Sequence, residues 1–489
     1  MTAGVRILEI HQAAWKRCKR FVSTFRLALP FSERRVLLMV GDVLVVNTAV
    51  LAALWLWAWI DGLAFTFDLV QARWFWFPAL SGTWWCLAWL GDLYDVTVAG
   101  RRFEVTWRIL LVMAEFTFGY LLIYFVSPRD TLPRLFFLFF STLTLFGMIL
   151  WRWMYIAVFA MPALSRRALI VGAGWSGRAL ARVLSVRDTE DYQIVGFVDD
   201  DVELEGTKVA GLPVLGGNAG LVTLVQAHQV DEVVVNVTHE MGKTLFQALL
   251  ACQAAGTHVV RMPDLYEQLT RQVPVEHVNA SWVLDALDGL AALGHLERAA
   301  KRLLDLGCGL VGLIGLGFLL PFVALVICLD DGGPVFYTQV RSGMGGIPFR
   351  LFKLRTMRRS AEKDGRPRWA RENDGRVTRA GRILRRTRLD ELPQVINILR
   401  GEMSIVGPRP ERPEFIADLE TQVPFYSTRL VVKPGLTGWG QIHYGYGNGV
   451  EDTLVKLQYD LYYIRHWSLW LDLYVIFKTI GVVLRCKGT

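Results

Sequence analysis

The sequence has little of several features that define common protein classes. Its six cysteines are scattered, and no two have CxxC or zinc-ligand spacing, which argues against a disulfide framework or a structural metal site. The first 35 residues are polar and basic and lack an early apolar run, so no cleavable signal peptide is predicted. Repeats are absent, and so is a basic helix or aromatic-basic array, so nucleic-acid binding is not expected.

What the sequence does contain is largely apolar. Hydrophobic residues make up 53% of the 489 residues, and the mean hydropathy is +0.33, too apolar for an ordinary soluble protein. Many of the 18 tryptophans lie near the ends of apolar runs, as in proteins whose aromatic rings sit at a bilayer interface. The net charge of +8 suits a cytoplasmic face that meets anionic lipid or phosphorylated substrates.

Four apolar runs come first, each near the length that crosses a hydrocarbon core. Basic residues cluster before the first run and after the fourth, whereas the loop between the third and fourth has only Arg129 and Arg134, offset in part by Asp130. This asymmetry predicts a four-helix transmembrane unit with both ends in the cytoplasm. Asp42, near the basic end of the first run, is interpreted as a helix-packing or interface residue; a functional intramembrane acid is the alternative. The runs cover 36–60, 74–90, 107–126 and 135–155.

The next segment alternates short apolar strands with helical patterns, which predicts a parallel doubly wound sheet. Its stretch "ALIVGAGWSGRALARVL" reads as strand, glycine-rich turn and helix. A nucleotide site and a fold whose glycines serve only the tight turn both fit. A reductase or epimerase would need a Tyr-x-x-x-Lys pair, but Thr270 stands four residues after Tyr266. The dinucleotide-binding pattern falls on Gly172, Gly174, Gly177 and Asp199.

A fifth apolar run follows Lys301 and Arg302 and ends at Asp330 and Asp331. It is long enough to span a membrane, but Pro321 interrupts it, and an interior proline removes a hydrogen bond and bends a helix. A full crossing would put the most basic part of the chain outside the cell. A re-entrant hairpin that returns to the cytoplasmic face is therefore favoured over a full crossing.

The C-terminal third is dense in cations that form no single helical stripe. Arg409 lies between Pro408 and Pro410, and an arginine on a restrained backbone loses less entropy when it binds phosphate. Lys353 and Arg355 in "FKLRTM" are further candidates for phosphate binding. The alternative is a basic surface that holds anionic lipid. The tail "HWSLWLDLYVIFKTIGVVLR" predicts an amphipathic helix in the membrane interface.

Two adjacent acids, Asp390 and Glu391, stand among these arginines. Arg385 and Arg386 are expected to lower the pKa of both carboxyls, and Pro393 puts the pair near a helix start, where backbone N–H groups favour phosphate. Adjacent helical residues point about 100° apart, so one acid can face a phosphorus atom while the other holds Mg²⁺. The simpler alternative is a capped helix whose acids only stabilise its N-terminus.

Several unusual sequence motifs follow one another along the C-terminal part of the chain: "KRLLDL", "PVFYTQVRSGMGG", "FKLRTM", "RTRLDELPQVINILRGEMSIVGPRP", "KPGLTGWGQ" and "YDLYYIRHWSLWLDL". Together they resemble the bacterial polyprenyl-phosphate hexose-1-phosphate transferases, and specifically the long-form monotopic phosphoglycosyl transferases. The resemblance is close from Lys301 to the end. Arg388 stands where a serine is common, and "TGWGQ" replaces the commoner "TGWAQ".

The resemblance implies a reaction and a role for particular residues. Asp390 is the implied nucleophile toward the β-phosphate of UDP-glucose or UDP-galactose, and Glu391 the implied Mg²⁺ ligand. Release of UMP leaves a phosphosugar aspartate, from which undecaprenyl phosphate takes the sugar phosphate, as the first membrane step of exopolysaccharide, capsule or O-antigen synthesis. The family's further site positions correspond to Lys353, Arg385, Asp472 and, in the nucleotide-phosphate loop, Arg409, while its helix break corresponds to Pro321.

The expected fold class is a membrane α protein with α/β domains, in the bacterial inner membrane and with its catalytic domain in the cytoplasm. A membrane-anchored NAD-dependent oxidoreductase or epimerase and a non-catalytic assembly scaffold are the rival functions. The oligomeric state is open, with a homodimer through the middle domain favoured. The predicted parts are a basic segment (1–35), a four-helix unit (36–162), a Rossmann-like domain (163–295), a re-entrant hairpin (296–330) and a catalytic domain with an interfacial helix (331–489).

Overall fold

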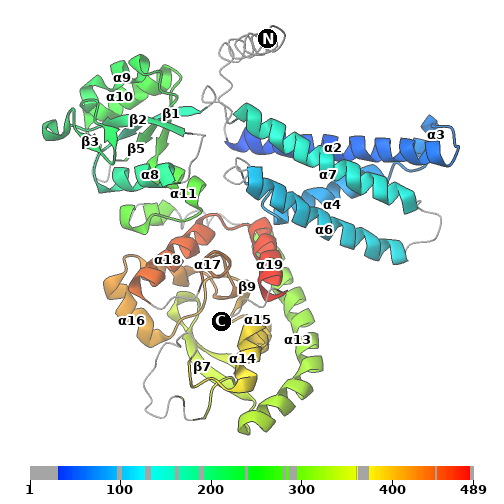
Figure 1. The fold of residues 1–489 in the computed structure, drawn as a ribbon. Coiled ribbons are helices and arrows are strands. Elements are labelled where there is room, and N and C mark those ends of the chain that lie inside the picture. The colour runs from blue at the N-terminus through cyan, green and yellow to red at the C-terminus, as the bar shows by residue number, and fades with distance from the viewer. Residues whose placement is uncertain are drawn as a thin grey trace, which may run out of the picture. The chain divides into compact units, whose positions relative to one another are not determined.

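The computed structural model in Figure 1 divides into two compact units, Met1–Met262 and Pro263–Thr489. The predicted basic segment 1–35 lies outside the described residues as far as residue 30, and the loops at 96–101 and 127–133 that enter the topology prediction also lie outside them. The structure describes residues 31–95, 102–126, 134–159, 165–186, 192–236, 241–278, 282–285, 294–359, 361, 374–445 and 449–484.

Four helices of the first unit correspond to the four apolar runs. Helix α2 lies beside α7 and α4, and α6 packs against α7 and α4 (Figure 1). Leu38, Val46, Phe116, Phe140 and Met148 are buried between them and form one apolar core. The helices are α2 (Phe31–Ile60), α4 (Trp76–Leu90), α6 (Arg102–Val126) and α7 (Arg134–Phe159), with the short α3 (Phe67–Gln71) after α2.

Only part of the predicted membrane topology is confirmed. At 15 residues, α4 is roughly 22 Å long, less than the hydrocarbon core of about 30 Å. Helix α6 carries the charged residues Arg102, Glu104, Arg108 and Glu115. The unit with four crossings therefore stays a prediction, while the apolar helices identify a membrane protein. Three described helices are long and apolar enough to cross a membrane: Arg34–Ile60, Phe136–Val158 and His295–Asp331.

A buried ion pair joins three helices of this unit. Arg152 on α7 lies 2.7 Å from Asp42 on α2, and each side chain is only 1% exposed. The indole of Trp84 on α4 donates to the same carboxylate at 3.2 Å, and Arg152 also donates to the carbonyl of Leu93. A buried acid is retained when it is paired and hydrogen-bonded, and these contacts favour the helix-packing role for Asp42.

The rest of the first unit is built on a parallel sheet with strand order β2-β1-β5-β6. Leu169, Val171 and Val233 on its central strands are fully or almost fully buried beneath the helices, which confirms the predicted doubly wound domain. The elements are β1 (Arg166–Val171), α8 (Trp175–Val186), β2 (Tyr192–Val198), the hairpin β3 (Lys208–Val209) and β4 (Leu212–Pro213), α9 (Leu221–Ala227), β5 (Glu232–Val235), α10 (Lys243–Ala254) and β6 (His258–Arg261).

The second unit surrounds two small sheets with helices (Figure 1). Strands β7 (Phe336–Ser342) and β8 (Pro348–Leu354) form an antiparallel hairpin, and β9 (Ser404–Val406) pairs in parallel with β10 (Gly435–Thr437). The helical elements are α11 (Met262–Thr270), η3 (Val275–His277), α13 (His295–Asp331), η4 (Met344–Gly346), α14 (Arg379–Arg386), η5 (Leu389–Gln394), α15 (Val395–Arg400), α16 (Pro413–Gln422), η6 (Tyr426–Val431), α17 (Trp439–His443), α18 (Val450–Arg465) and α19 (Leu469–Leu484).

The predicted re-entrant hairpin is one helix, α13, with Pro321 inside it. Figure 1 shows this helix bending toward its C-terminal end rather than separating into two helices. Both ends are held by the same unit. The carboxylate of Asp305 accepts a hydrogen bond from Ser404 at 2.8 Å, and that of Asp330 accepts one from the backbone N–H of Ala380 at 2.7 Å.

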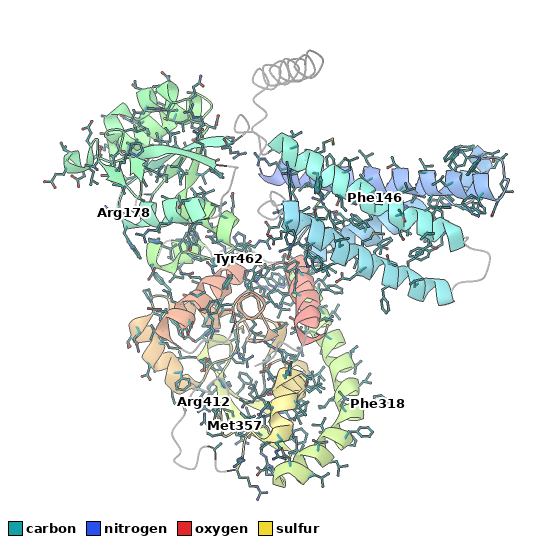
Figure 2. The ribbon with its side chains drawn as sticks, viewed as in Figure 1. Phe146, Arg178, Phe318, Met357, Arg412 and Tyr462 are labelled. Atoms are coloured by element: carbon teal, nitrogen blue, oxygen red, sulfur yellow. The ribbon has the colours of Figure 1, made fainter. Side chains whose placement is uncertain are left out.

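The surface of α13 between these anchors is apolar. Phe318 is 76% exposed and points away from the helix (Figure 2). Leu310, Val311, Phe322 and Leu329 are exposed as well. Such a helix is stable only when its outer surface is covered by apolar material, and a lipid bilayer supplies that material.

A candidate active site around two adjacent carboxylates

The two acids are carried by the 3₁₀ helix η5, which packs against β8 and α14. It follows Arg388, whose backbone is left-handed (φ 56°), a conformation that costs a non-glycine residue about 1–2 kcal/mol. The resulting sharp turn buries Asp390 and Glu391, each only 7% exposed. The predicted helix start is thus a tighter 3₁₀ turn, with Pro393 inside it. Gly401 ends the following helix α15 in the left-handed conformation, with φ 84°.

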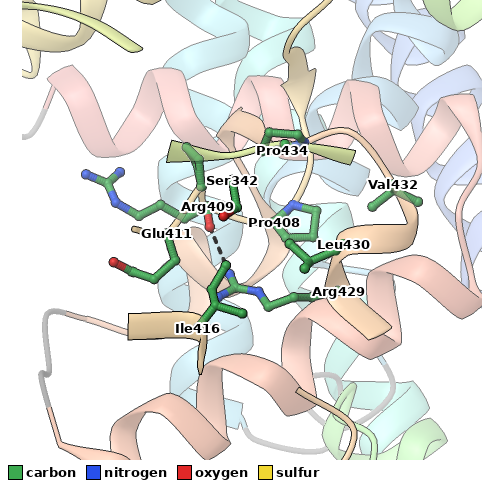
Figure 3. A pocket seen from close by; sticks show the side chains of 11 residues that line it. Ser342, Pro408, Arg409, Glu411, Ile416, Arg429, Leu430, Val432 and Pro434 are labelled. Carbon is green, nitrogen blue, oxygen red and sulfur yellow. Dashed lines mark hydrogen bonds between the residues drawn. The ribbon is translucent and has the colours of Figure 1, made fainter. Parts of the chain in front are cut away.

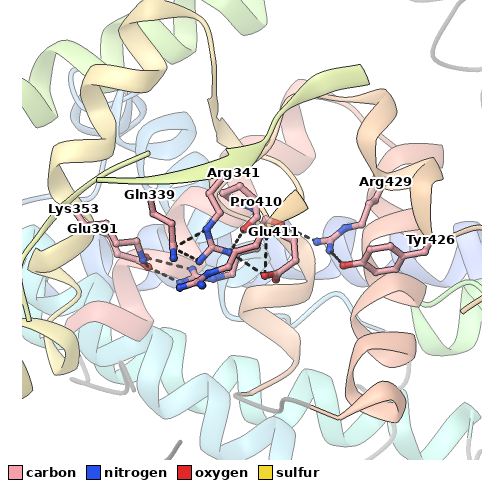
Figure 4. A network of polar contacts seen from close by, with 10 residues as sticks. Gln339, Arg341, Lys353, Glu391, Pro410, Glu411, Tyr426 and Arg429 are labelled. Carbon is pink, nitrogen blue, oxygen red and sulfur yellow. Dashed lines mark hydrogen bonds and ion pairs between the residues drawn. The ribbon is translucent and has the colours of Figure 1, made fainter. Parts of the chain in front are cut away.

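Glu391 is held by two cations from different elements (Figure 4). Lys353 Nζ lies 2.9 Å and Arg409 Nη2 2.6 Å from the same oxygen, Oε1. The other oxygen, Oε2, has only a 3.5 Å contact with Arg409 Nη1. Burial by itself would raise the pKa of Glu391, but the charges of Arg409 and Lys353 hold that pKa well below its usual value. Glu391 is therefore ionised throughout the physiological range.

Asp390 is in a different state although it is the next residue. Among the described residues no hydrogen bond to its carboxylate is found, and its pKa is raised to about 6 by burial and by the charge of Glu391, which outweigh the cations Lys353, Arg385 and Arg409. Arg385 lowers the pKa of Asp390, as predicted, but the predicted net lowering is wrong because desolvation is the larger effect.

Lys353 and Arg385 are brought to this pair, as predicted. Lys353 lies on β8, and its pKa is lowered by burial and by the charge of Arg409. Arg385, in the last turn of α14, donates through Nε to the hydroxyl of Thr356 at 3.0 Å, and its charge acts on Asp390. Strand, helix and loop thus each contribute one cation.

Arg355 has a different position. Its guanidinium donates to the carbonyls of Gly333 at 2.8 Å and Asp331 at 3.2 Å, and also to that of Gly332. These groups lie at the C-terminal end of α13, where helix carbonyls attract cations. The contacts of Arg355 therefore anchor the apolar helix, and none of them reaches the acid pair in the described chain.

Asp472 forms a second buried centre in the same unit. It is 0% exposed, and it accepts hydrogen bonds from Lys301 at 2.7 Å, Tyr463 at 2.7 Å and Trp467 at 3.1 Å. Lys301 and Tyr463 also donate to the carbonyl of Val406 at the end of β9. The network ties the beginning of α13 to α19 and to the strand that leads into the Pro408–Pro410 loop.

A small pocket lies against that loop (Figure 3). Its wall includes Ser342 and Gly343 at the end of β7, the loop itself, and Arg429 on η6. Sequence patterns did not indicate Arg429, because an isolated arginine in "YSTRLVV" has no neighbouring motif. Its importance is visible only once the fold places its guanidinium beside the backbone of Arg409, at 2.9 Å from the carbonyl oxygen.

The glycine-rich loop of the first unit satisfies its own polar groups. Gly172 has φ +102°, and a Cβ on Gly177 would lie 2.2 Å from the Gly172 oxygen, so both glycines are required by the turn itself. Asp199 accepts hydrogen bonds from the backbone N–H groups of Ala173 at 2.7 Å and Asp201 at 3.0 Å. Of the two interpretations left open, this geometry favours glycines that serve the fold. A Cβ on Gly174 would meet open space.

Two models of known protein families match different parts of the chain. The family model described as "Bacterial sugar transferase" matches residues 296–486, and the one described as "CoA-binding domain" matches residues 89–263. The first of these ranges contains the acid pair, all three of its cations and α13 except its first residue, His295. The chain belongs to the bacterial sugar transferase family.

Within the family, the relatives act on several different sugars. The chain is 34% identical over 325 residues to a UDP-glucose:undecaprenyl-phosphate glucose-1-phosphate transferase of Xanthomonas campestris pv. campestris, covering 66% of this chain and 67% of the relative. It is 36% identical to a UDP-N-acetylgalactosamine-undecaprenyl-phosphate N-acetylgalactosaminephosphotransferase of Aeromonas hydrophila, covering 49% and 55%. It is 30% identical to a UDP-galactose-lipid carrier transferase of Erwinia amylovora, covering 66% and 69%. The chain thus spans little more than half to about two thirds of these relatives.

Proposed function

We propose that this protein transfers a hexose-1-phosphate from a UDP-sugar to undecaprenyl phosphate and releases UMP. The observation that carries the proposal is the pairing of two buried carboxylates in different states. Glu391 is ionised and fixed by Lys353 and Arg409, whereas Asp390 has a pKa of about 6. The relatives' names supply the two substrates.

In the first step, a carboxylate oxygen of Asp390 attacks the β-phosphorus of the UDP-sugar. The bond between that phosphorus and the bridging oxygen breaks, UMP leaves with the electron pair, and a phosphosugar aspartate forms. At neutral pH a carboxyl with a pKa of about 6 is mostly ionised and is more basic than an ordinary aspartate. At this pH the ionised form that can attack is therefore abundant, and it is a stronger nucleophile than an ordinary aspartate.

In the second step, a phosphate oxygen of undecaprenyl phosphate attacks the same phosphorus. The acyl phosphate bond breaks, Asp390 is regenerated as a carboxylate, and undecaprenyl-diphosphate-sugar is the product. Both steps bring anions together, and Lys353, Arg385 and Arg409 offset that repulsion. Because the covalent intermediate separates the steps, the nucleotide and the lipid do not have to occupy the site together.

Mg²⁺ is proposed as the cofactor, and the donor chemistry at the acid pair fits it. No group of three or more metal-ligating side chains is found in the described part of the chain, so the protein offers no complete cage. Glu391 Oε2 has only its 3.5 Å contact with Arg409 and can serve as a ligand. Mg²⁺ is commonly held by one or two carboxylates plus substrate phosphates, where it neutralises phosphate charge.

The proposal places the site at the cytoplasmic face of the inner membrane. Both ends of α13 are anchored in the catalytic unit through Asp305 and Asp330, which favours a bent helix that enters and leaves the bilayer on one side. The exposed apolar surface of α13 reaches the lipid substrate's environment, while UDP-sugars are cytoplasmic. Glucose, galactose and N-acetylgalactosamine are all candidate sugars.

The test is to incubate the purified full chain with UDP-glucose, UDP-galactose or UDP-N-acetylgalactosamine and Mg²⁺ before adding lipid. We expect a phosphosugar adduct on Asp390 by mass spectrometry, and transfer of sugar radiolabel to a lipid extract once undecaprenyl phosphate is added. A change in NADH absorbance without adduct would instead support the oxidoreductase. Absence of both adduct and lipid product with every sugar would contradict the proposal.

A further inference from the structure

The backbone of the loop that carries Arg409 must be held in place by other parts of the protein. Its side chain reaches Glu391 from the connection between β9 and α16, at 2.6 Å, although nearly half of it (46%) is exposed. Pro408 and Pro410 have no N–H groups, so the loop backbone can be held mainly through its carbonyls. What fixes these carbonyls decides where the guanidinium points.

The carbonyl of Arg409 is held by Arg429. Its Nη2 donates to that oxygen at 2.9 Å and lies 2.8 Å from a carboxylate oxygen of Asp460 on α18. The side chains of Arg429 and Asp460 are 9% and 6% exposed. A buried guanidinium without a counter-charge is strongly destabilising, so Asp460 is what allows Arg429 to lie there. Tyr426 accepts a further hydrogen bond from the same guanidinium.

The next carbonyl, that of Pro410, is held from the opposite side by Arg341 (Figure 4). Arg341 Nη1 lies 3.2 Å from that oxygen and 2.9 Å from Glu411 Oε1. Gln339 accepts from Nη2 and Nε of the same guanidinium at 2.7 and 3.1 Å. Arg341 and Lys353 lie on the two strands of the β7–β8 hairpin, so this hairpin contacts both the loop and Glu391. The backbone N–H of Ser342, on the same hairpin, also donates to the carbonyl of Glu411 at 2.9 Å.

We propose that Arg341 and Arg429 are positioning residues that clamp consecutive carbonyls of the Pro408–Pro410 loop and thereby aim Arg409 at Glu391. This inference rests on the proposed function for its kinetic consequences, although the clamp itself concerns only the fold. Neither arginine is assigned a contact with substrate. Their forks suit this task because one guanidinium can donate to a carbonyl and a carboxylate at once, which a lysine cannot reproduce with the same geometry.

Loosening the clamp has a consequence for Arg409. Its guanidinium lies 2.6 Å from Glu391 only while the loop backbone is fixed. A mobile cation loses more entropy when it binds the phosphates of a UDP-sugar. The KM for UDP-glucose should therefore rise more than kcat falls.

The test compares Arg429→Lys and Asp460→Asn with the control Arg465→Lys, which changes a different partly buried arginine of the same unit, paired with Asp264 and Glu267. Hydrogen exchange of the peptide that contains residues 407–412 is measured by mass spectrometry, and UMP release is measured against the concentration of UDP-glucose. We expect faster exchange in both clamp variants and a KM for UDP-glucose raised roughly 10-fold to 100-fold with a smaller change in kcat, and neither effect in Arg465→Lys.

Each result either supports or overturns the clamp. Exchange and KM like those of the wild type in folded Arg429→Lys would overturn the inference, as would equal changes in the control. If Arg429→Lys does not fold, Arg341→Lys and Asp460→Asn give the same decision. The exchange measurement does not depend on catalysis, so a protein without transferase activity would contradict the proposed function while leaving the clamp confirmed or overturned by exchange alone.

Discussion

Two aspartates in different units differ in how their carboxylates are hydrogen-bonded. Asp199 closes a strand in the glycine-rich domain, and both of its oxygens accept backbone hydrogen bonds, from Ala173 and Asp201. Asp390 is buried beside Glu391, and no hydrogen bond to its carboxylate is found in the described chain. The first carboxylate satisfies the fold, whereas the second is left with unused acceptor capacity.

The difference matters because removing an ionised carboxylate from water costs free energy unless hydrogen bonds replace the lost hydration. A fold tolerates that cost at a position where something other than the protein completes the interactions. The raised pKa of Asp390 records the cost, and the cations around it limit that cost. This contrast assigns chemistry to the second unit and architecture to the glycine-rich loop.

The largest effect is expected for Asp390→Asn. An amide cannot attack phosphorus, so we expect loss of both the covalent adduct and the lipid product, by at least about 10³-fold in turnover. Because the change removes an unpaired buried charge, the thermal midpoint should stay equal or rise. Turnover is measured as UMP release. A variant with near wild-type turnover would show that Asp390 is not the nucleophile.

The next largest effect is expected for Glu391→Gln. The substitution removes the charge that Lys353 and Arg409 share and a proposed Mg²⁺ ligand. Turnover should fall by roughly 10²-fold, and the Mg²⁺ concentration needed for half-maximal activity should rise. The same titration after EDTA treatment of the wild type gives the reference. An unchanged Mg²⁺ dependence would remove Glu391 from the metal site while leaving its role toward Lys353 and Arg409 intact.

Much of this architecture was predictable because it depends on local patterns. Period and length in the chain predict the apolar helices, and the strand–turn–helix pattern around Gly172 predicts the parallel sheet. The acid pair was identified from its place among arginines and prolines.

The parts that were not predicted depend on long-range contacts. Arg355 stands in the same motif as Lys353, yet it faces the end of α13. Strand β8 ends at Leu354, so the period-two alternation that would put residues 353 and 355 on one face no longer holds at Arg355. The raised pKa of Asp390 depends on burial, which no spacing reveals. Arg429 and Asp460 are 31 positions apart in the sequence, and only the packing of η6 on α18 pairs them.

The pH dependence of UMP release is a further test of the role of Asp390. Asp390 must be ionised to attack, and its pKa is about 6, so UMP release should fall as the pH drops through about 6. Lys353 is the strongest of the cations that lower this pKa. In Lys353→Met the pKa of Asp390 rises, and the acid limb should move up by about one pH unit. Lys243→Met, on α10 of the first unit, serves as the control and should leave the limb in place.

The smallest effect is expected at the other aspartate. In Asp199→Asn only one side-chain oxygen remains to accept from Ala173 and Asp201, and the new amide group meets a backbone N–H. The cost should be about 1–2 kcal/mol of stability in the first unit, measured by chemical denaturation. UMP release should change by no more than about twofold, because none of the groups that act on Asp390 is in this unit. A tenfold fall in UMP release without unfolding would mean that the glycine-rich loop communicates with the acid pair through a bound ligand, and the contrast between the two aspartates would then no longer hold.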